Sequence, residues 1–396
     1  MSVAKIFPNR RISWSFVTNP FFVTTIYLVL ALVIGLKQYL HHSYNNYSIF
    51  KYVYYHTIDT LNLYSAYPEY NDSNHYGPVF SLVIAPFALL PDGLGMILWN
   101  IANVIVLLWG IYSLPISVQN RSIIAWICAH ETLTALFSFQ FNIALTGMIL
   151  MSFSYIIKQK DIKSALVIAL GTCIKLYGIV GLAFFFFSKQ KLKFIFAGIF
   201  ALAICFALPL LLSSPGFIVR SYQDWFHSLS EKNAVNASLT SLQDISVMGI
   251  TRRITQNIHL PNWPFLLVGL LLFSLPYLRI SQFRFLEFRL LLLASTLIFT
   301  VIFSSGSESP TYIIAFAGVA IWFITQQKPF ANWQVALFIF AFLLTSLSPT
   351  DLFPKSFRNF VHLYSLKALP CVLIWLAIIY QMMTENFKQY TIATND

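Results

Sequence analysis

Three ionisable residues lie within apolar stretches of the sequence. His130 and Glu131 are neighbours within the segment 122–138, and Lys175 stands alone midway through the segment 164–187. A charge at mid-membrane costs at least about 2.5–3.5 kcal/mol, so each such residue needs a partner or a function. A lone lysine beside a helix break could bind a phosphate as a point charge. Pairing with Glu131, or extension of the ammonium to the membrane surface, would explain Lys175 without a function.

Glu308 suggests a different chemistry, because it precedes an apolar segment instead of interrupting one. Ser309 and Pro310 follow it, and such a pair favours the start of a helix. The carboxylate could therefore simply complement the helix dipole. It could also remove a proton as a general base at the membrane surface. The sequence leaves both interpretations open.

The stretch 38–77 is rich in tyrosine and ends in a polar run that contains Asp72 and His75. Aromatic rings with a polar tip, such as Tyr64, are typical of membrane interfaces. The same rings could stack against the apolar faces of sugars. An acidic residue such as Asp72 is most often a solvated loop charge, but it is also a candidate for substrate binding.

The composition determines the class of protein that must position these residues. Of the 396 residues, 58% are hydrophobic and 10% are charged, whereas soluble chains carry about 25% charged residues. This composition excludes a soluble enzyme and a disordered chain. A nucleic-acid-binding module is also excluded, because the basic residues are scattered between apolar segments. The sequence contains no nucleotide-binding loop, nucleophile elbow or zinc motif, and the four cysteines lie in apolar segments. We therefore expect no cofactor and no metal.

About twelve apolar segments could cross a bilayer or dip into it, since a full crossing needs about 20 residues. Helices are expected because backbone groups within lipid need partners in their own segment. We predict an all-α, polytopic transmembrane protein with residues 1–396 as a single integral membrane domain, in which some short segments could be re-entrant. The segments are 20–37, 78–91, 94–114, 122–138, 143–157, 164–187, 192–213, 263–279, 288–305, 311–326, 333–348 and 367–383.

The positive charges predict an orientation. With the N-terminus in the cytoplasm, twelve crossings return the C-terminus to the same side. Residues 38–77 and 214–262 then form the first and second periplasmic loops of a multi-pass protein in a bacterial inner membrane. The basic clusters that then face the cytoplasm, as the positive-inside rule requires, are Lys5/Arg10/Arg11, Lys189/Lys191/Lys193 and Arg279/Arg284/Arg289.

A fourth cluster, of three lysines at positions 158–163, falls on the outer side if the segments flanking it cross fully. It returns to the cytoplasm if the segment 164–187 is re-entrant and one of the two segments before it is too. Lys175 would then occupy the tip of a broken helix, and Gly171 and Gly178 on either side would permit the break. The sequence leaves full crossing and re-entry both open.

Several short motifs, taken in order, resemble glycosyltransferase family 87, a family of the GT-C class of membrane glycosyltransferases. A run at 307–312 also resembles a motif of a bacterial branch of this family. Each motif is weak alone, and their order and spacing carry the resemblance. The motifs are Asn46-Tyr47-Ser48-Ile49-Phe50, Leu63-Tyr64, Tyr76-Gly77-Pro78, Ala85-Pro86-Phe87-Ala88-Leu89-Leu90-Pro91, Gln140-Phe141-Asn142 and Ile174-Lys175-Leu176-Tyr177.

The resemblance implies an inverting transfer of a sugar, expected to be mannose, from a polyprenyl-phosphate donor to a lipid-linked or envelope glycan. Lys175 would bind the lipid phosphate, with Arg252 or Arg253 as helpers, and Glu308 would be the base. The partners would be the donor, the glycan acceptor and the bilayer, without nucleic acid. The expected catalytic residues are Glu308 and Asn46, and the expected substrate-binding residues are Lys175, Glu131, Gln140, Asn142, Tyr64, Asp72, His75 and Tyr312.

One position departs from the family pattern, because Asn46 stands where the family has an aspartate in its first loop. An asparagine cannot accept a proton from a hydroxyl group. Either Glu308, Glu69 or Asp72 acts as the base, or Asn46 only holds a substrate. A third possibility is that the chain is a non-catalytic assembly protein of an envelope polysaccharide pathway.

A transporter or lipid-carrier flippase is a further alternative. Glu131 and Lys175 could line its path through the membrane. The sequence shows no internal repeat, whereas many transporter folds are built from repeats.

Overall fold

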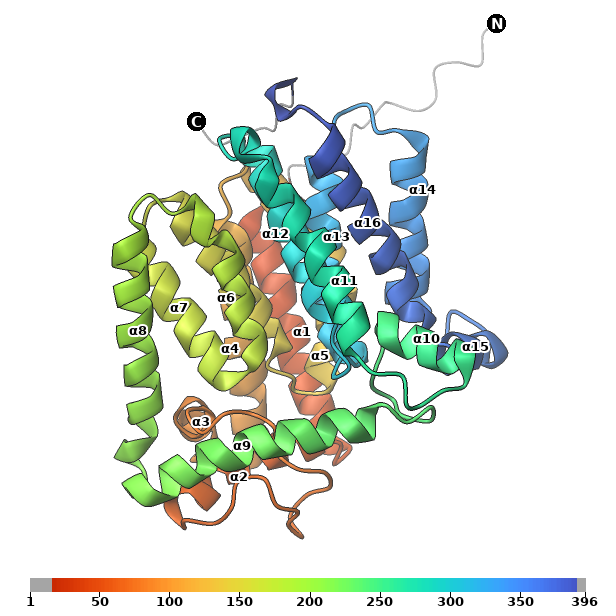
Figure 1. Cartoon of the computed structure of the whole chain (residues 1–396). Coiled ribbons are helices and arrows are strands. Elements are labelled where there is room, and N and C mark those ends of the chain that lie inside the picture. The colour runs from red at the N-terminus through yellow and green to blue at the C-terminus, as the bar shows by residue number, and fades with distance from the viewer. Residues whose placement is uncertain (1–15, 390–396) are drawn as a thin grey trace, which may run out of the picture.

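The computed structural model describes residues 16–389, and within this range the chain is helical and has no strand. Most helices stand side by side in a bundle (Figure 1). The bundle helices are α1 (Pro20–Leu40), α4 (Asp92–Ser113), α5 (Val118–Phe137), α6 (Asn142–Ile157), α7 (Asp161–Ile174), α8 (Lys191–Ala207), α11 (Trp263–Ser274), α12 (Leu286–Ile302), α13 (Tyr312–Thr325), α14 (Asn332–Phe340) and α16 (Leu369–Thr384).

The remaining α-helices lie at one end of the bundle, at the bottom of Figure 1. They are α2 (Asn45–Ile58), α3 (Phe80–Ala88), α9 (Pro215–Asn236), α10 (Val247–Thr255) and α15 (Lys355–Leu363). Short 3-10 helices continue or connect these elements: η1 (Leu176–Phe187), η2 (Leu208–Leu211), η3 (Leu275–Leu278), η4 (Ile280–Gln282), η5 (Ser309–Thr311), η7 (Leu366–Ala368) and η8 (Phe387–Gln389). A π-helix, η6 (Ala341–Leu347), extends α14.

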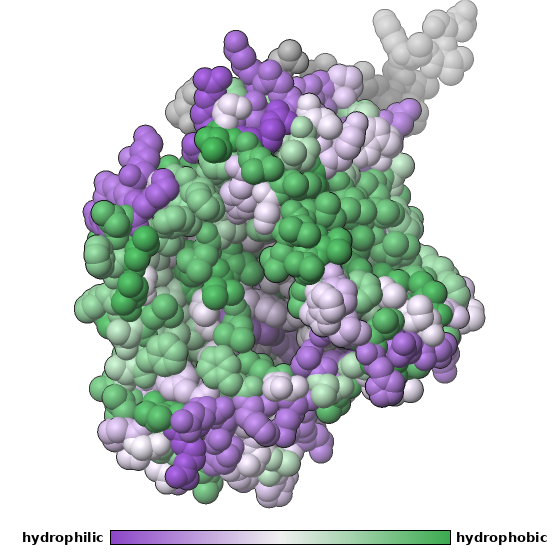
Figure 2. Space-filling model, viewed as in Figure 1, coloured by the Kyte–Doolittle hydropathy of each residue, from purple (hydrophilic) through white to green (hydrophobic). Residues whose placement is uncertain are grey.

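Four helical stretches are long and apolar enough to cross a membrane: Pro20–Leu40, Asp92–Ser113, Lys191–Leu211 and Leu366–Thr384. Shorter apolar helices stand beside them in the bundle. The structure therefore confirms an all-helical protein with membrane-spanning helices but does not confirm twelve spans. Figure 2 shows a broad apolar band across the face in view, between two more polar ends, as a protein surrounded by lipid requires.

The expected segment 78–91 does not form a span. The segment 78–91 contains only α3, whose nine residues extend about 14 Å at 1.5 Å per residue. This length is about half the thickness of a bilayer core. The helix packs against α2 and α4 at the lower end of the bundle.

The two stretches expected as periplasmic loops are themselves largely helical. The stretch 38–77 contains α2, and the stretch 214–262 contains α9 and α10. Helix α9 runs across the lower end of the bundle (Figure 1). It starts with Ser214 as a cap, whose hydroxyl accepts from the backbone N–H of Phe217, and with a proline at its first position, a common helix start. These helices cover the end of the bundle where the first cavity described below lies.

The chain reverses direction at Lys175. Helix α7 and η1 form a hairpin whose outer ends are joined by a hydrogen bond from Ser188 to Asp161. Its two arms touch through glycine: a Cβ added to Gly178 would lie 2.2 Å from the carbonyl carbon of Gly171. The segment 164–187 thus enters and leaves the bundle at the same end, and full crossing of this segment is wrong.

The hairpin also brings the basic clusters together. Lys158 donates to the carbonyl of Ser113 (2.7 Å), so the end of α6 lies beside the end of α4. The Arg289 guanidinium lies 5.3 Å from the Phe187 ring, so the start of α12 lies beside the end of η1. The lysines at 158–163 therefore lie at the same end as those at 189–193. The alternative in which the segment 122–138 or 143–157 is also re-entrant is not needed, because 78–91 is a second segment that does not cross. The cluster Lys5/Arg10/Arg11 lies outside the described residues.

The glycine contact gives a first prediction. We expect Gly178→Ala to lower the free energy of unfolding by about 3 kcal/mol, because the new methyl group would overlap backbone atoms of α7. Gly198→Ala is the matched control, since nothing lies within 4 Å of a Cβ there. Thermal unfolding in lipid nanodiscs measures both. Equal melting temperatures for the two variants would contradict the hairpin packing.

Candidate functional site

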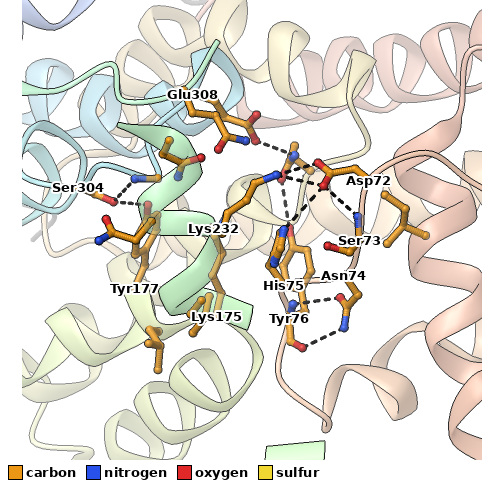
Figure 3. A pocket seen from close by; sticks show the side chains of 18 of the residues that line it. Asp72, Ser73, Asn74, His75, Tyr76, Lys175, Tyr177, Lys232, Ser304 and Glu308 are labelled. Carbon is orange, nitrogen blue, oxygen red and sulfur yellow. Dashed lines mark hydrogen bonds and ion pairs between the residues drawn. The ribbon is translucent and has the colours of Figure 1, made fainter. Parts of the chain in front are cut away.

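A cavity of about 340 Å³, the first cavity, lies at the lower end of the bundle above α9. The face in Figure 2 has a hollow there, with polar side chains inside. Its walls come from the loop before α3, the tip of the α7–η1 hairpin, α9 and the loop after α12 (Figure 3). The polar side chains that line it include Asn46, Asp72, His75, Tyr76, Gln140, Lys175, Tyr177, Lys232, Gln243, Ser304 and Glu308.

Glu308 is held in this cavity by a hydrogen bond from Gln140, which Tyr76 in turn holds in place. The Gln140 amide donates to its Oε1 (2.9 Å), and the Tyr76 hydroxyl donates to the Gln140 carbonyl oxygen (3.1 Å). On the other side, the Glu308 backbone N–H donates to Thr311 Oγ1 (3.3 Å), at the start of the short helix η5. The side chain thus lines the cavity, and Gln140 connects it to Tyr76 of the loop before α3.

The surroundings of Glu308 favour a proton acceptor. Burial raises the pKa of this carboxyl above its ordinary value, and the positive charges of Lys175 and Lys232 only partly oppose the effect. A carboxylate with a raised pKa is a stronger base than a solvated one.

Lys175 occupies the break between α7 and η1. Its ammonium donates to Asn142 Oδ1 (2.8 Å) and lies 5.5 Å from the Tyr76 ring and 5.1 Å from the Tyr177 ring. Among residues 16–389, no carboxylate forms an ion pair with it, and Glu131 pairs with Lys367 instead. An ammonium held by an amide and two aromatic faces keeps its charge available for an anionic ligand.

A glycine allows the loop before α3 to reach the hairpin tip. The Gly77 N–H donates to the carbonyl of Ile174 (2.9 Å), which is one of the carbonyl groups released by the helix break. A Cβ at Gly77 would lie 2.0 Å from the carbonyl oxygen of Cys173. Only glycine permits this approach, which brings Tyr76 and Lys175 to the same cavity.

Lys232 of α9 is a second cation of the cavity, and no motif in the sequence pointed to it. Its ammonium binds both oxygens of Asp72 (2.9 and 3.1 Å) (Figure 3). His75 lies beside this pair, with Nδ1 2.9 Å from Ser228 Oγ. Burial and the nearby Lys232 lower the His75 pKa to about 4, so the imidazole is neutral at pH 7. Only the position of Lys232 in a helical segment, with Ser228 four residues earlier, could have indicated a shared face.

Asn46 lines the cavity and donates from its amide to the carbonyl of Ser138 (2.9 Å). A carboxylate at this position could not donate, and it would face a carbonyl oxygen. The departure from the family's aspartate thus matches its surroundings in this chain.

The other expected site residues differ in their placement. Asn142 lies behind Lys175 as its partner, and the Tyr64 hydroxyl donates to the carbonyl of Tyr76 (3.1 Å), behind the cavity wall. Tyr312 lies outside the first cavity, where its hydroxyl donates to the carbonyl of Ile245 (2.8 Å). Glu69 is exposed and does not line the cavity.

Glu131 is buried away from the first cavity. Its carboxylate binds the Lys367 ammonium (3.0 and 3.3 Å), which also donates to Ser309 Oγ (2.9 Å). Ser309 directly follows Glu308. The buried pair therefore supports the loop that carries Glu308, which makes Glu131 and Lys367 positioning residues.

Of the two expected phosphate helpers, Arg252 is committed elsewhere. It is 3% exposed, forms an ion pair with Asp244 (2.5 Å) and donates to the carbonyl of Leu260 (2.8 Å). Its contacts connect α10 to the segment before α11. Arg253 also lies outside the first cavity and lines a second one.

A helical membrane bundle with a carboxylate and an ammonium in one surface cavity has the types of group that a membrane-embedded group transferase needs. The family comparison agrees. The model of glycosyltransferase family 87 matches residues 74–305, more than half of the chain, and the chain belongs to this family. It is a membrane glycosyltransferase by family. No curated protein matches the chain. The matched range includes Gln140, Lys175 and Lys232 but neither Asn46 nor Glu308.

The support beneath Glu308 gives a second prediction. We expect Lys367→Met to lower the free energy of unfolding by about 3–5 kcal/mol, because it leaves the carboxylate of Glu131 buried without a partner. Lys51→Met is the control, since Lys51 and its partner Asp92 are partly exposed and such pairs contribute at most about 1 kcal/mol. Chemical unfolding in detergent micelles measures both. A smaller loss for Lys367→Met than for Lys51→Met would contradict the role of the pair.

Proposed function

We propose that this protein transfers a sugar, mannose as the first candidate, from a polyprenyl-phosphate donor to a lipid-linked or envelope glycan. The observation that carries the proposal is that Glu308 and Lys175 line the same cavity. The reaction needs a base for the acceptor hydroxyl and a cation for the departing phosphate. Family membership supports the transfer of a sugar. The polyprenyl-phosphate donor and the glycan acceptor are what the resemblance to this family implies.

The position of the cavity supports transfer at the outer face of the membrane. Lysines at 158–163 and 189–193 and the arginines at 284 and 289 lie at the opposite end of the bundle. The positive-inside rule places that end in the cytoplasm. The first cavity then opens on the periplasmic side of a bacterial inner membrane. The N-terminal end of α1 and the C-terminal end of α16 then lie on the cytoplasmic side.

The reaction is a displacement at the anomeric carbon. The oxygen of the acceptor hydroxyl forms the new bond to the anomeric carbon, and Glu308 takes the proton of that hydroxyl as the bond forms. The bond from that carbon to the phosphate oxygen breaks, and Lys175 stabilises the negative charge that develops on the leaving phosphate, with Lys232 on the facing wall. The proton on Glu308 then passes to water. Asn46 and the aromatic side chain of Tyr76 shape the space for the sugar.

Two other carboxylates are weaker candidates for the base. Asp72 lines the same cavity, but both of its oxygens bind Lys232. Glu69 is exposed and outside the cavity. A transporter path through Glu131 and Lys175 has little support, because Glu131 binds Lys367 and does not line the first cavity.

The assignment of the base gives a third prediction. We expect Glu308→Gln to reduce the rate of transfer from polyprenyl-phosphate mannose about 10²–10⁴-fold, the usual contribution of a general base, with the KM for the donor little changed. Lys175→Met should weaken donor binding as well. Glu69→Gln is the control and should keep the wild-type rate. The measurement is transfer of labelled sugar to a lipid-glycan extract by protein in liposomes.

The variants also separate the alternatives. Loss of transfer in Asp72→Asn but not in Glu308→Gln would assign the base to Asp72. If wild-type protein transfers no sugar from any polyprenyl phosphate, the transferase proposal is wrong. Assays of lipid-carrier movement and of envelope assembly would then test the flippase and the assembly protein.

The raised pKa of Glu308 gives a fourth prediction. The base must be deprotonated, so the transfer rate falls as the pH falls through the pKa of Glu308, which lies above the ordinary 4.5. The acid limb of the rate profile should therefore appear at higher pH than for a solvated glutamate. His75→Asn should keep this limb, because His75, with a pKa of about 4, stays neutral over that range. A limb that disappears with His75 would contradict the assignment.

A further inference from the structure

A second cavity, of about 580 Å³, adjoins the first, and Glu308 lines both. It lies between the loop that carries Glu308 and the helices α10 and α15 at the lower right of Figure 1. Nothing in the proposed reaction yet uses it. Apart from Glu308, its ionisable side chains are all basic or neutral: Arg253, Lys355, Arg358, His362 and Lys367.

Arg253 is the central cation of the second cavity. Its side chain is 2% exposed, and its guanidinium donates to the carbonyls of Ser241 (2.8 Å), Gln243 (3.0 Å) and Asp244 (3.1 Å). Its Nε is buried and has no hydrogen-bond partner. A charged donor that is buried and unsatisfied is costly in a folded protein. An anionic ligand in the cavity would supply the missing acceptor.

The cations of the second cavity outnumber their carboxylate partners. Lys367 is neutralised by Glu131, and Arg358 binds Asp351 at the exposed rim. In the stretch 16–389, neither Arg253 nor Lys355 forms an ion pair with a carboxylate. The cavity is therefore positively charged on the side away from Glu308.

Helix α15 forms the outer wall and is strongly two-sided. Arg358 and His362 line the cavity, whereas the side chains of Phe357, Phe360 and Leu363 are 37%, 51% and 53% exposed. A short helix with one basic face and one aromatic face is typical of a membrane interface. The second cavity thus opens at the level where the headgroup of a membrane-attached molecule would lie.

We propose that the second cavity binds the acceptor and that this acceptor carries an anionic oxygen group, a phosphate or a carboxylate. The inference rests on the proposed function, in which Lys175 holds the donor phosphate in the first cavity. Because Glu308 is shared, a donor sugar in the first cavity and an acceptor hydroxyl from the second can meet at its carboxylate. The guanidinium of Arg253 and the ammonium of Lys355 match the geometry and charge of such a group.

Direct binding to the full-length protein in nanodiscs tests this assignment. The probes are mannose 6-phosphate and glucuronate as anionic sugars, mannose as their uncharged counterpart, and farnesyl phosphate as a sugar-free donor analogue. We expect at least one anionic sugar to bind about tenfold or more tightly than mannose. Lys355→Gln/Arg358→Gln should remove this difference and leave binding of farnesyl phosphate unchanged. Lys175→Met should weaken binding of farnesyl phosphate and leave binding of the anionic sugars unchanged.

The rim variant is chosen because Lys355 is exposed and Arg358 only partly buried, so the fold should tolerate it. Arg253→Lys keeps the charge but loses the several N–H donors of the guanidinium. It should weaken binding of the anionic sugar without affecting binding of farnesyl phosphate. Lys189→Gln/Lys191→Gln removes two charges at the opposite end of the bundle and is the matched control.

Two results would overturn the inference. If the rim variant weakens farnesyl phosphate and not the anionic sugars, the second cavity belongs to the donor site. If mannose binds as tightly as both anionic sugars, the acceptor site does not select a charge. Failure of the proposed function looks different: farnesyl phosphate would then bind independently of Lys175, whatever the anionic sugars do.

Discussion

The rest of the site depends on the break in the chain at Lys175. A helix that ends inside a membrane bundle leaves backbone groups without partners, and the protein needs a neighbour to satisfy them. The loop before α3 does so through Gly77, whose N–H binds the carbonyl of Ile174. The same contact places Tyr76 against the Lys175 ammonium. A backbone requirement and a functional arrangement are thus met by one close approach.

Charged groups in this bundle fall into two kinds. The pair of Glu131 and Lys367 is buried and internally satisfied, and it fixes the loop of Glu308 through Ser309. The Lys175 ammonium donates to an amide and lies against two aromatic rings, and no carboxylate of the described residues 16–389 forms an ion pair with it, so its charge remains available to a ligand. Position in an apolar segment does not distinguish a paired charge from an available one. The distinction lies in whether an oppositely charged partner reaches the group.

Several features of the fold follow from the sequence, and others do not. The glycines around Lys175 permitted the hairpin, which the sequence left open beside full crossing. The resemblance to the family supplied Gln140, which the structure places against Glu308. The expected crossing by the segment 78–91 was wrong, because this segment is apolar like a span and only its nine-residue helix shows that it stays at one end of the bundle. Lys232 was missed because a lysine in a long polar stretch resembles a solvated charge until α9 brings it to Asp72.

The sequence by itself determined the helical membrane class and the residue types available for transfer. These properties depend on composition and local spacing, which lipid solvation and helix geometry translate directly into structure. Only the tertiary structure decided which charge pairs with which. Glu131 lies 236 positions from Lys367 in the chain, and Gln140 lies 168 from Glu308. Contacts over such separations arise from helix packing, and no local pattern encodes them.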